Sequence, residues 1–404
     1  MNRVVITGQG TINALGANVP STKTAMERGE CGISALDFKD VDRLSIKIGA
    51  QISGYDSSGY FNRQQLSLYD PFTQYALIAA QEAVEQSGLT ITDQASQRMG
   101  VVLGTAGGGL QTQDENFRAV YKDQKNRVHP FVVPRLMNNA AASHVSMTLK
   151  ITGPVYSVAT ACASSNHAMG QAFHMLRSGS VDVMLTGGSE SMLSFGGIKA
   201  WEGLRVMSND GCRPFCASRN GMVQGEGAAV FVFETLDHAL KRGADILAEV
   251  AGFSMTSDAS DIVMPSQHGA QRAISGALAD AKLNPEDIGY INAHGTATKA
   301  NDKTESAAVH TVFGGHASSV MVSSTKSMHG HVIGGTGAIE LIACIMAVRD
   351  GVIAPTIGHT RADPDCDLDV VPNQARDHTV TAAISNAFAF GGLNAVLAVK
   401  KFQI

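Results

Sequence analysis

The chain has 404 residues, of which 44% are apolar and 17% are charged, so it is long enough to bury a sizeable hydrophobic core. Its net charge of −5, and the absence of a Lys/Arg block with interleaved aromatics, argue against nucleic acid as a partner. The N-terminal apolar run at 4–7 is too short for a signal sequence or a membrane span, and the six scattered cysteines form no disulfide framework. We therefore expect a cytoplasmic protein that has no membrane partner.

Short β-branched runs alternate with Ala/Gly-rich helical stretches along the whole chain. This pattern predicts an α/β layered protein whose strands are largely buried. The candidate strands of the first half are 4–7, 101–104, 155–159, 181–187 and 228–234, and those of the second half are 247–253, 288–293, 320–324, 380–385 and 395–400.

The two halves repeat the order strand, polar turn, small-residue helix. The strand at 155–159 leads past Cys162 into a helix, and the strand at 320–324 leads past Lys326 and His331 into another. Because the spacing between matches is not constant, we predict a divergent duplication rather than a repeat array. Both helices are apolar on nearly every face, so we expect them between sheets in a five-layer α-β-α-β-α arrangement.

The duplication divides the chain into an N-terminal half at 1–245 and a C-terminal half at 246–404. The stretch at about 110–145, which contains Pro130 and Pro134, fits neither half. We expect it to be an inserted cap or interface element.

One thiol and two imidazoles each follow a strand-like run. Cys162 lies in Ala-Thr-Ala-Cys-Ala-Ser-Ser, His294 in Asn-Ala-His-Gly-Thr and His331 in Lys-Ser-Met-His-Gly-His. A helix N-terminus lowers the pKa of a thiol, so the position of Cys162 favours an activated nucleophile over a buried core cysteine. A lone histidine is usually a satisfied polar residue, but two histidines together with this thiol suit thioester chemistry.

These strings, together with Val-Val-Ile-Thr-Gly at 4–8 and Phe-Ala-Phe-Gly-Gly at 388–392, resemble the β-ketoacyl carrier-protein synthases, the condensing enzymes of fatty-acid and polyketide assembly. The resemblance covers nearly the whole chain and implies the thiolase fold. It also implies decarboxylative Claisen condensation of an acyl chain on Cys162 with a malonyl thioester, which lengthens the chain by two carbons. His294 and His331 would donate N–H bonds to the thioester oxygen, each contributing roughly 3 to 4 kcal/mol.

The resemblance assigns supporting roles to charged residues. Lys326, Asp302 and Glu305 match a buried polar network, although their local strings also fit a solvated turn. Glu340 is the only charge in an apolar stretch and is expected to be paired, because an unpaired buried carboxylate is costly. We interpret His329 as a neighbour of the site and not as a donor.

Further residues match the part of the family site that handles the substrate arm. Thr296 and Thr298 match threonines that hold the amides of the phosphopantetheine arm. Phe390 matches a gating aromatic residue whose N–H joins that of the thiol residue in an oxyanion hole. The following Gly391 and Gly392 allow close approach and movement of the backbone.

Two departures from the family concern substrate and partner. Gly107 stands where many long-chain enzymes carry a larger side chain, so we predict a deeper or wider acyl pocket, bounded partly by Phe195 and Trp201. The turn at 62–68, which is strongly basic in housekeeping enzymes, retains only Arg63. Carrier docking is therefore expected at Arg63 and Arg205, with Lys199, the cluster Lys122, Lys125 and Arg127, or a dedicated carrier as alternatives.

The strings at 299–302 and 364–369 resemble the nodulation protein E branch and aromatic polyketide ketosynthases more than housekeeping enzymes, which favours a specialised lipid or polyketide product. The family resemblance implies an acyl carrier protein partner and a dimer, either of this chain alone or with a related chain. We expect no resident cofactor and no metal; Cys212 and Cys216 lack the second pair that a zinc site needs.

Two other functions remain in view. A degradative thiolase would need a second reactive cysteine near the C-terminus, and 385–394 contains none. A non-catalytic chain-length partner of a heterodimeric ketosynthase typically lacks the nucleophile, whereas Cys162 is present.

Overall fold

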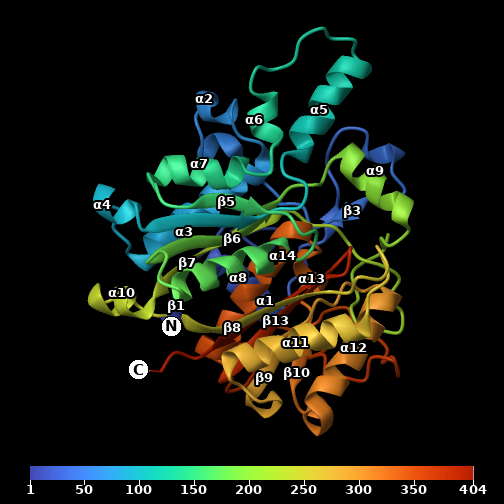
Figure 1. The fold of residues 1–404 in the computed structure, drawn as a ribbon. Helices are drawn as coiled ribbons and strands as arrows, with labels where there is room; N and C mark the ends of the chain where they lie inside the picture. The colour runs from blue at the N-terminus through green and yellow to red at the C-terminus, as the bar shows by residue number, and fades with distance from the viewer. Residues whose placement is uncertain (404) are drawn as a thin grey trace.

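The computed structural model describes residues 1–403 and is built around one ten-stranded sheet (Figure 1). The strand order is β10-β9-β13-β14-β8-β1-β7-β6-β4-β5. The bounds are β1 Val4–Asn13, β4 Met99–Gly104, β5 Val155–Val158, β6 Val183–Glu190, β7 Gly227–Thr235, β8 Ala248–Ser257, β9 Ile288–Asn292, β10 Met321–Ser323, β13 Ala382–Ala389 and β14 Leu393–Lys400. Two-residue strands pair as β2 (Ser34–Ala35) with β3 (Ile48–Gly49) and β11 (Val352–Ile353) with β12 (Arg376–Asp377).

The two halves of the sheet have the same topology. In the first half β5, β4 and β6 are parallel and are extended by antiparallel β7 and β1. In the second half β10, β9 and β13 are parallel and are extended by antiparallel β14 and β8. This correspondence confirms the predicted duplication. The halves are continuous at one corner, where three residues of β1 pair with three of β8, and we propose residue 245 as the boundary between them.

All ten predicted strands are present, and β1 is longer than predicted. It continues past Gly8 and Gly10 because these glycines let helix α3 (Pro71–Ser87) lie directly against the strand. A Cβ at Gly8 would lie 2.1 Å from the carbonyl oxygen of Ala83, and one at Gly10 would lie 2.0 Å from that of Ala79. The glycines that made the sequence run look short are therefore part of the strand.

Helices form three layers around the sheet. Helices α8 and α14 contact strands of both halves, so they form the middle layer, between the two halves of the sheet. Helices α3 and α7 cover the outer face of the first half, and α11 with α12 covers that of the second. Every residue of α14 is buried. The bounds are α1 Val19–Arg28, α2 Arg63–Leu66, α3 Pro71–Ser87, α4 Asp93–Ser96, α5 Leu110–Tyr121, α6 Val132–Leu136, α7 Ala140–Leu149, α8 Ser164–Arg177, α9 Phe195–Leu204, α10 Leu236–Lys241, α11 Gln267–Ala281, α12 Lys299–Phe313, α13 Lys326–His329 and α14 Thr336–Ile345.

The stretch at 110–145 forms α5, a connecting loop, α6 and the start of α7. Figure 1 shows α5 and α6 projecting beyond the layered body. Helix α7 instead packs on α3, β4 and β5, so the part that stands apart ends before it. The projecting part carries exposed apolar side chains, namely Phe117, Val120, Tyr121, Val128, Phe131, Val133 and Met137.

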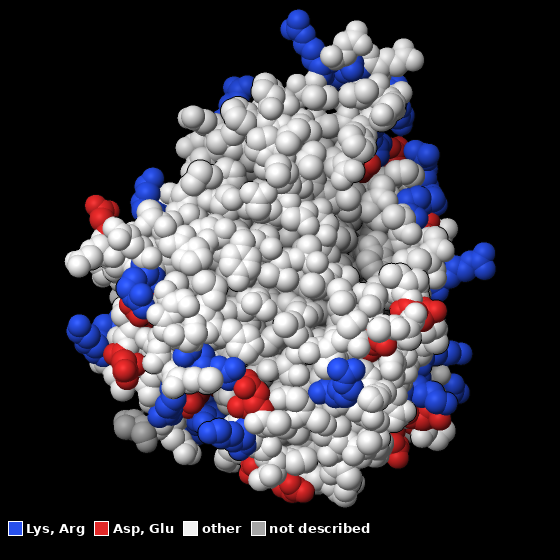
Figure 2. Space-filling model, in the orientation of Figure 1, with Lys and Arg blue, Asp and Glu red and all other residues white. Residues whose placement is uncertain are grey.

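The face of the molecule that carries α7, β5 and α8 has few charged side chains at its centre, and Lys and Arg lie toward its margins (Figure 2). Within residues 1–403, none of the helices has the combination of length and apolar character that crossing a membrane requires.

Candidate active site

Cys162 lies in a tight turn between β5 and α8. Ala161 adopts a left-handed backbone conformation, with φ of 49°, and reverses the chain just before the thiol residue. The Ser164 hydroxyl braces this turn by accepting the N–H of Thr160 at 2.9 Å and donating to the carbonyl oxygen of Ala161 at 2.7 Å. Cys162 is 6% exposed, so the turn presents a largely buried sulfur.

Burial raises the pKa of the Cys162 thiol to about 12, although the Lys326 cation and the N–H groups of Phe390 and Cys162 act in the opposite direction. The N–H of Cys162, just before the helix, lowers the pKa as predicted, but burial outweighs this effect. The first N–H groups of the turn are already used, because those of Ala163 and Ser164 donate to backbone carbonyl oxygens. The N–H of Phe390 acts on the thiol, and its role in an oxyanion hole stays a prediction.

His331 is held as the tautomer that carries its proton on Nε2. Its Nδ1 accepts the N–H of Ile333 at 3.2 Å and lies 2.9 Å from the hydroxyl of Thr336. Ile333 has φ of 45°, which is strained for a β-branched residue. The Nε2 atom is buried and has no hydrogen-bond partner among residues 1–403. His331 therefore presents an unused N–H donor.

His294 follows β9 and is positioned through its backbone. The N–H groups of His294 and Gly295 each donate to the Glu305 carboxylate at 2.8 Å. Glu305 also accepts from the side chain of Asn386 at 3.1 Å. The ring of His294 lies 5.6 Å from that of His331, centre to centre, with the planes at 84°.

Both rings are uncharged at neutral pH. Burial holds the pKa of His294 and of His331 well below the ordinary histidine value, and the Lys326 cation lowers both further. Lys326 itself is fully buried and forms an ion pair with Glu340. The Lys326 ammonium group lies close enough to the thiol and the two imidazoles to lower the pKa of all three.

The predicted network of Lys326, Asp302 and Glu305 is buried, which rules out a solvated turn, and Glu340 is buried and paired as expected. Asp302 and Lys326 nevertheless have different charged partners. Asp302 accepts the N–H of Phe215 at 2.8 Å and is 3.6 Å from Arg219, while Lys326 pairs with Glu340. Asn301, which sequence reasoning missed, links the acidic residues by donating to Asp302 at 3.2 Å and to Glu305 at 3.5 Å.

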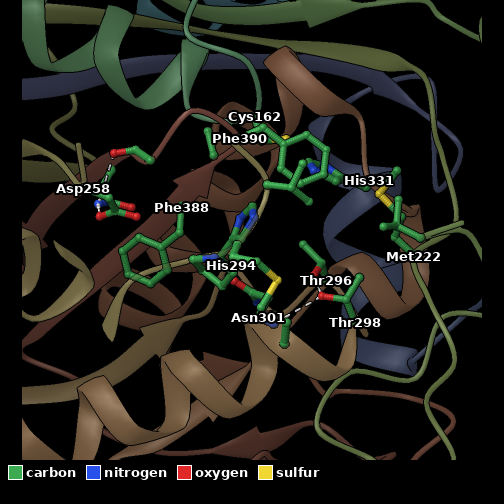
Figure 3. A pocket seen from close by; sticks show the side chains of 18 of the residues that line it. Cys162, Met222, Asp258, His294, Thr296, Thr298, Asn301, His331, Phe388 and Phe390 are labelled. Atoms are coloured by element: carbon green, nitrogen blue, oxygen red, sulfur yellow. Dashed lines mark hydrogen bonds between the residues drawn. The ribbon is translucent and has the colours of Figure 1, made fainter. Parts of the chain in front are cut away.

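One cavity of about 150 Å³ brings together eight of the predicted site residues, including the thiol and both imidazoles (Figure 3). Thr296 and Thr298 line it with their hydroxyl oxygens 2.9 Å apart. Phe390 and Trp201 line it with their rings stacked. The predicted residues on its wall are Cys162, His294, His331, Thr296, Thr298, Trp201, Phe390 and Gly392.

The predicted acyl pocket differs from the structure at two residues. Gly107 and Phe195 do not line this cavity. The space beside Gly107 is taken by Met192, whose Cε lies 2.5 Å from the position of a Cβ on Gly107. The Phe195 ring faces the guanidinium groups of Arg43 and Arg118 instead. A small residue at 107 therefore does not by itself create an open pocket.

The remaining predicted residues lie outside the cavity. Arg63 on α2 and Arg205 at the end of α9 are both exposed. His329 is fully buried, and its ring contacts the hydroxyl of Thr325 and the carbonyl oxygen of Gly330. Among residues 1–403, no three His, Cys, Asp or Glu side chains are grouped so that they could hold a metal ion.

Sequence reasoning also missed polar residues that shape the site. Asp258 lines the cavity and accepts from the side chain of Asn394 at 2.7 Å. Glu190, at the end of β6, accepts the N–H groups of Ala106 and Gly334 at 2.6 and 3.2 Å. In the sequence, the signal for such a site residue is a single polar side chain next to an apolar or glycine-rich run. Glu190 is an example.

Comparison with known proteins places this geometry in a family. Residues 1–239 match the family model "Beta-ketoacyl synthase, N-terminal domain", and residues 247–360 match "Beta-ketoacyl synthase, C-terminal domain". The chain is 47% identical to nodulation protein E of Rhizobium leguminosarum bv. trifolii and 40% identical to 3-oxoacyl-[acyl-carrier-protein] synthase 2 of Staphylococcus aureus (strain N315). Both matches cover 99% of each chain.

Solved structures agree in fold. The ishigamide ketosynthase/chain length factor is 33% identical with a TM-score of 0.95, and a β-ketoacyl synthase from Burkholderia phymatum STM815 is 30% identical with a TM-score of 0.92. Each covers 100% of both chains. The fold is therefore thiolase-like, and the chain belongs to the β-ketoacyl synthase family of carrier-protein-dependent condensing enzymes.

Proposed function

We propose that Cys162 carries the acyl chain, and that His294 and His331 together stabilise the enolate formed from a malonyl thioester. The observation that carries this proposal is the unpartnered Nε2–H of His331, which lies in the wall of the same cavity as Cys162 and His294. A buried donor without a partner is costly to a resting protein, and a ligand oxygen would satisfy it.

The first half-reaction transfers the acyl group to Cys162. The Sγ–C bond forms, the carrier's C–S bond breaks, and the thiol proton passes to the departing carrier sulfur. The N–H groups of Phe390 and Cys162 stabilise the oxyanion of the tetrahedral intermediate. Because the resting thiol is protonated, this half-reaction also requires its deprotonation.

The second half-reaction makes the new carbon–carbon bond. The malonyl C–C bond to the carboxylate breaks, carbon dioxide leaves, and the enolate oxygen takes the N–H bonds of His294 and His331. The enolate carbon attacks the acyl carbonyl, and the Cys162 thiolate leaves and takes up a proton from solvent. Burial lowers the pKa of both rings, and the Lys326 charge lowers it further. Both imidazoles are therefore neutral and can donate N–H bonds to the enolate.

The substrates arrive on the phosphopantetheine arm of an acyl carrier protein, so the reaction needs no resident cofactor. Thr296 and Thr298 suit the amides of this arm because two hydroxyls can each donate or accept. The carrier is acidic in this family, and exposed Arg63, Arg205 and Lys199 are the groups proposed to receive it. A solved relative, 29% identical, is described as a type II polyketide acyl-carrier protein in complex with its ketosynthase.

A homodimer through the open edge of β5 is also proposed. Tyr156 on this strand is 37% exposed, and β5 has a ladder partner on one side only, which is β4. An exposed edge strand pairs readily with another strand, and two copies related by a twofold axis would join their sheets there. The exposed apolar residues of α5 and α6 would enlarge the contact.

A specialised acyl product is preferred to a housekeeping one, because the chain is more similar to nodulation protein E than to 3-oxoacyl synthase 2. Condensation assays with a panel of acyl carriers, with products resolved by mass, identify the preferred chain. A single preferred bulky or unsaturated donor supports a dedicated pathway, and equal use of ordinary saturated donors contradicts it.

Acylation at Cys162 is the decisive test of the function. Incubation with an acyl carrier donor, followed by peptide mass spectrometry, should find the acyl group on Cys162. With a malonyl carrier added, the product should contain two more carbons. A chain-length partner that only shapes a neighbour's pocket would remain unacylated, and that result would overturn the proposal.

A further inference from the structure

Trp201 and Phe390 form an aromatic stack in the wall of the cavity. Their ring centres are 5.8 Å apart with the planes at 24°, and both side chains are partly buried. Trp201 is the only tryptophan of the chain. Because stacked aromatic rings attract each other beyond the effect of burial alone, the position of one ring depends on the other.

The Trp201 side of the stack is anchored. Trp201 belongs to α9, and its neighbour Glu202 ties that helix to the body of the protein. The Glu202 carboxylate accepts the N–H of Ser45 at 2.6 Å and that of Ile46 at 2.9 Å. The tryptophan ring therefore projects from a helix that is held against another segment.

The segment that follows Phe390 is hydrogen-bonded to a surface loop. The two residues after it, Gly391 and Gly392, have φ of 82° and 68°, values that glycine adopts without strain. The N–H of Gly391 donates to the carbonyl oxygen of Ile262 at 2.8 Å, and the carbonyl of Gly392 accepts the N–H of Asp258 at 2.9 Å. Ile262 is 73% exposed, so this segment is bonded to an outer loop.

We propose that Trp201 is a positioning residue that holds the Phe390 ring beside Cys162 and thereby limits access to the thiol. This inference deepens the proposed function and rests on it. Entry of an acyl donor requires the Phe390 ring to leave its place, and the glycine pair and the outer loop allow that movement. The anchored indole opposes it, so the stack sets the fraction of molecules in which the thiol is open.

Alkylation by iodoacetamide measures access to Cys162 without requiring acyl transfer. Trp201→Leu, which cannot stack, should alkylate Cys162 about 2- to 10-fold faster than the natural protein, and Trp201→Phe should fall between them. Exposed Cys31 serves as the internal control, and its rate should not change. A thermal melt of each variant establishes that it is folded.

Fluorescence of the single tryptophan supplies a second readout. Phe390→Leu removes the stacking partner and should alter the resting emission of Trp201. Acylation of Cys162 by the octanoyl thioester of N-acetylcysteamine should alter the emission of the natural protein in the same direction, and Cys162→Ala should show no such change.

Two outcomes separate this inference from the proposed function. Folded Trp201→Leu that alkylates at the natural rate, or emission that is the same with and without Phe390, would overturn the role of Trp201. Faster alkylation of Trp201→Leu, without any acylation of the natural protein, would support the role of Trp201 while overturning the acyl-transfer function.

Discussion

The two halves of this protein share a strand order but place different chemistry at equivalent positions. The turn after β5 carries Cys162, and the equivalent turn after β10 leads to Lys326 and His331. The strand β6 ends at Glu190, a buried acceptor, whereas the equivalent β13 is followed by Phe390, whose backbone N–H lowers the pKa of the thiol. A duplicated backbone thus supplies the positions, and in the proposed mechanism the side chains that differ divide the reaction between the halves.

The halves also differ at their outer edges. In the second half, β10 is fully buried, because the N–H of Val322 donates to the carbonyl oxygen of Asp369 from a segment that covers the strand. In the first half, all four residues of β5 remain at least partly exposed. The chain itself therefore covers the edge strand β10, whereas the edge strand β5 is free to pair with a strand of a second molecule.

Removal of the thiol should distinguish the contributions of the two halves to the reaction most clearly. Cys162→Ala should reduce condensation by at least about 10³-fold, because no acyl intermediate can form. The histidines belong to the other half, so release of carbon dioxide from a malonyl carrier should continue. Measurement of both products checks the division of labour, and equal loss of the two would contradict it.

Removal of His331 should produce the opposite pattern. His331→Ala should slow decarboxylation by about 10²- to 10³-fold, because one enolate donor is lost. The rate of Cys162 acylation, measured by mass spectrometry of the intact protein, should fall far less. His331→Asn retains an N–H donor and should recover part of the rate; a variant that lost acylation to the same extent would show that the halves are not separable.

The pH dependence of alkylation tests the burial of the thiol. With a pKa near 12, the thiolate fraction of Cys162 rises about tenfold per pH unit, so alkylation should increase about 100-fold from pH 7 to pH 9 without a plateau. Peptide mass spectrometry follows the reaction. A plateau below pH 9 would mean that the backbone N–H groups and Lys326 outweigh burial.

A charge on the open edge should weaken the proposed dimer. Tyr156→Arg brings like charges from two copies together and should raise the dimer dissociation constant by about tenfold or more. Light scattering after gel filtration measures the change. Leu240→Arg, at an exposed position on α10, is the matched control and should leave the assembly intact. Unchanged assembly of Tyr156→Arg would exclude β5 from the interface.

The smallest effect is expected from the hydroxyl that faces His331. Thr336→Val removes one of the two groups at Nδ1 while the N–H of Ile333 remains. The decarboxylation rate should fall about 2- to 12-fold, as expected for one neutral hydrogen bond. Thr336→Ser retains the hydroxyl and should behave like the natural protein.

Local patterns in the sequence were sufficient for the strands and the duplication, and the family resemblance of three short strings was sufficient to single out three residues that line one cavity. Strand and helix signals depend on neighbouring residues, so they can be read from a linear chain. The β-branched runs predicted all ten strands of the main sheet, and the strings around Cys162, His294 and His331 predicted the residues that share one cavity.

Only the tertiary structure decided the properties that depend on distant contacts. The pKa of Cys162 is raised because other segments bury it, and no helix-terminus argument contains that effect. Met192 fills the space beside Gly107, and Asp302 pairs away from Lys326, because each side chain meets partners far along the chain. Local sequence patterns identify the residues of the candidate site, whereas burial and long-range packing determine their protonation states and the space around them.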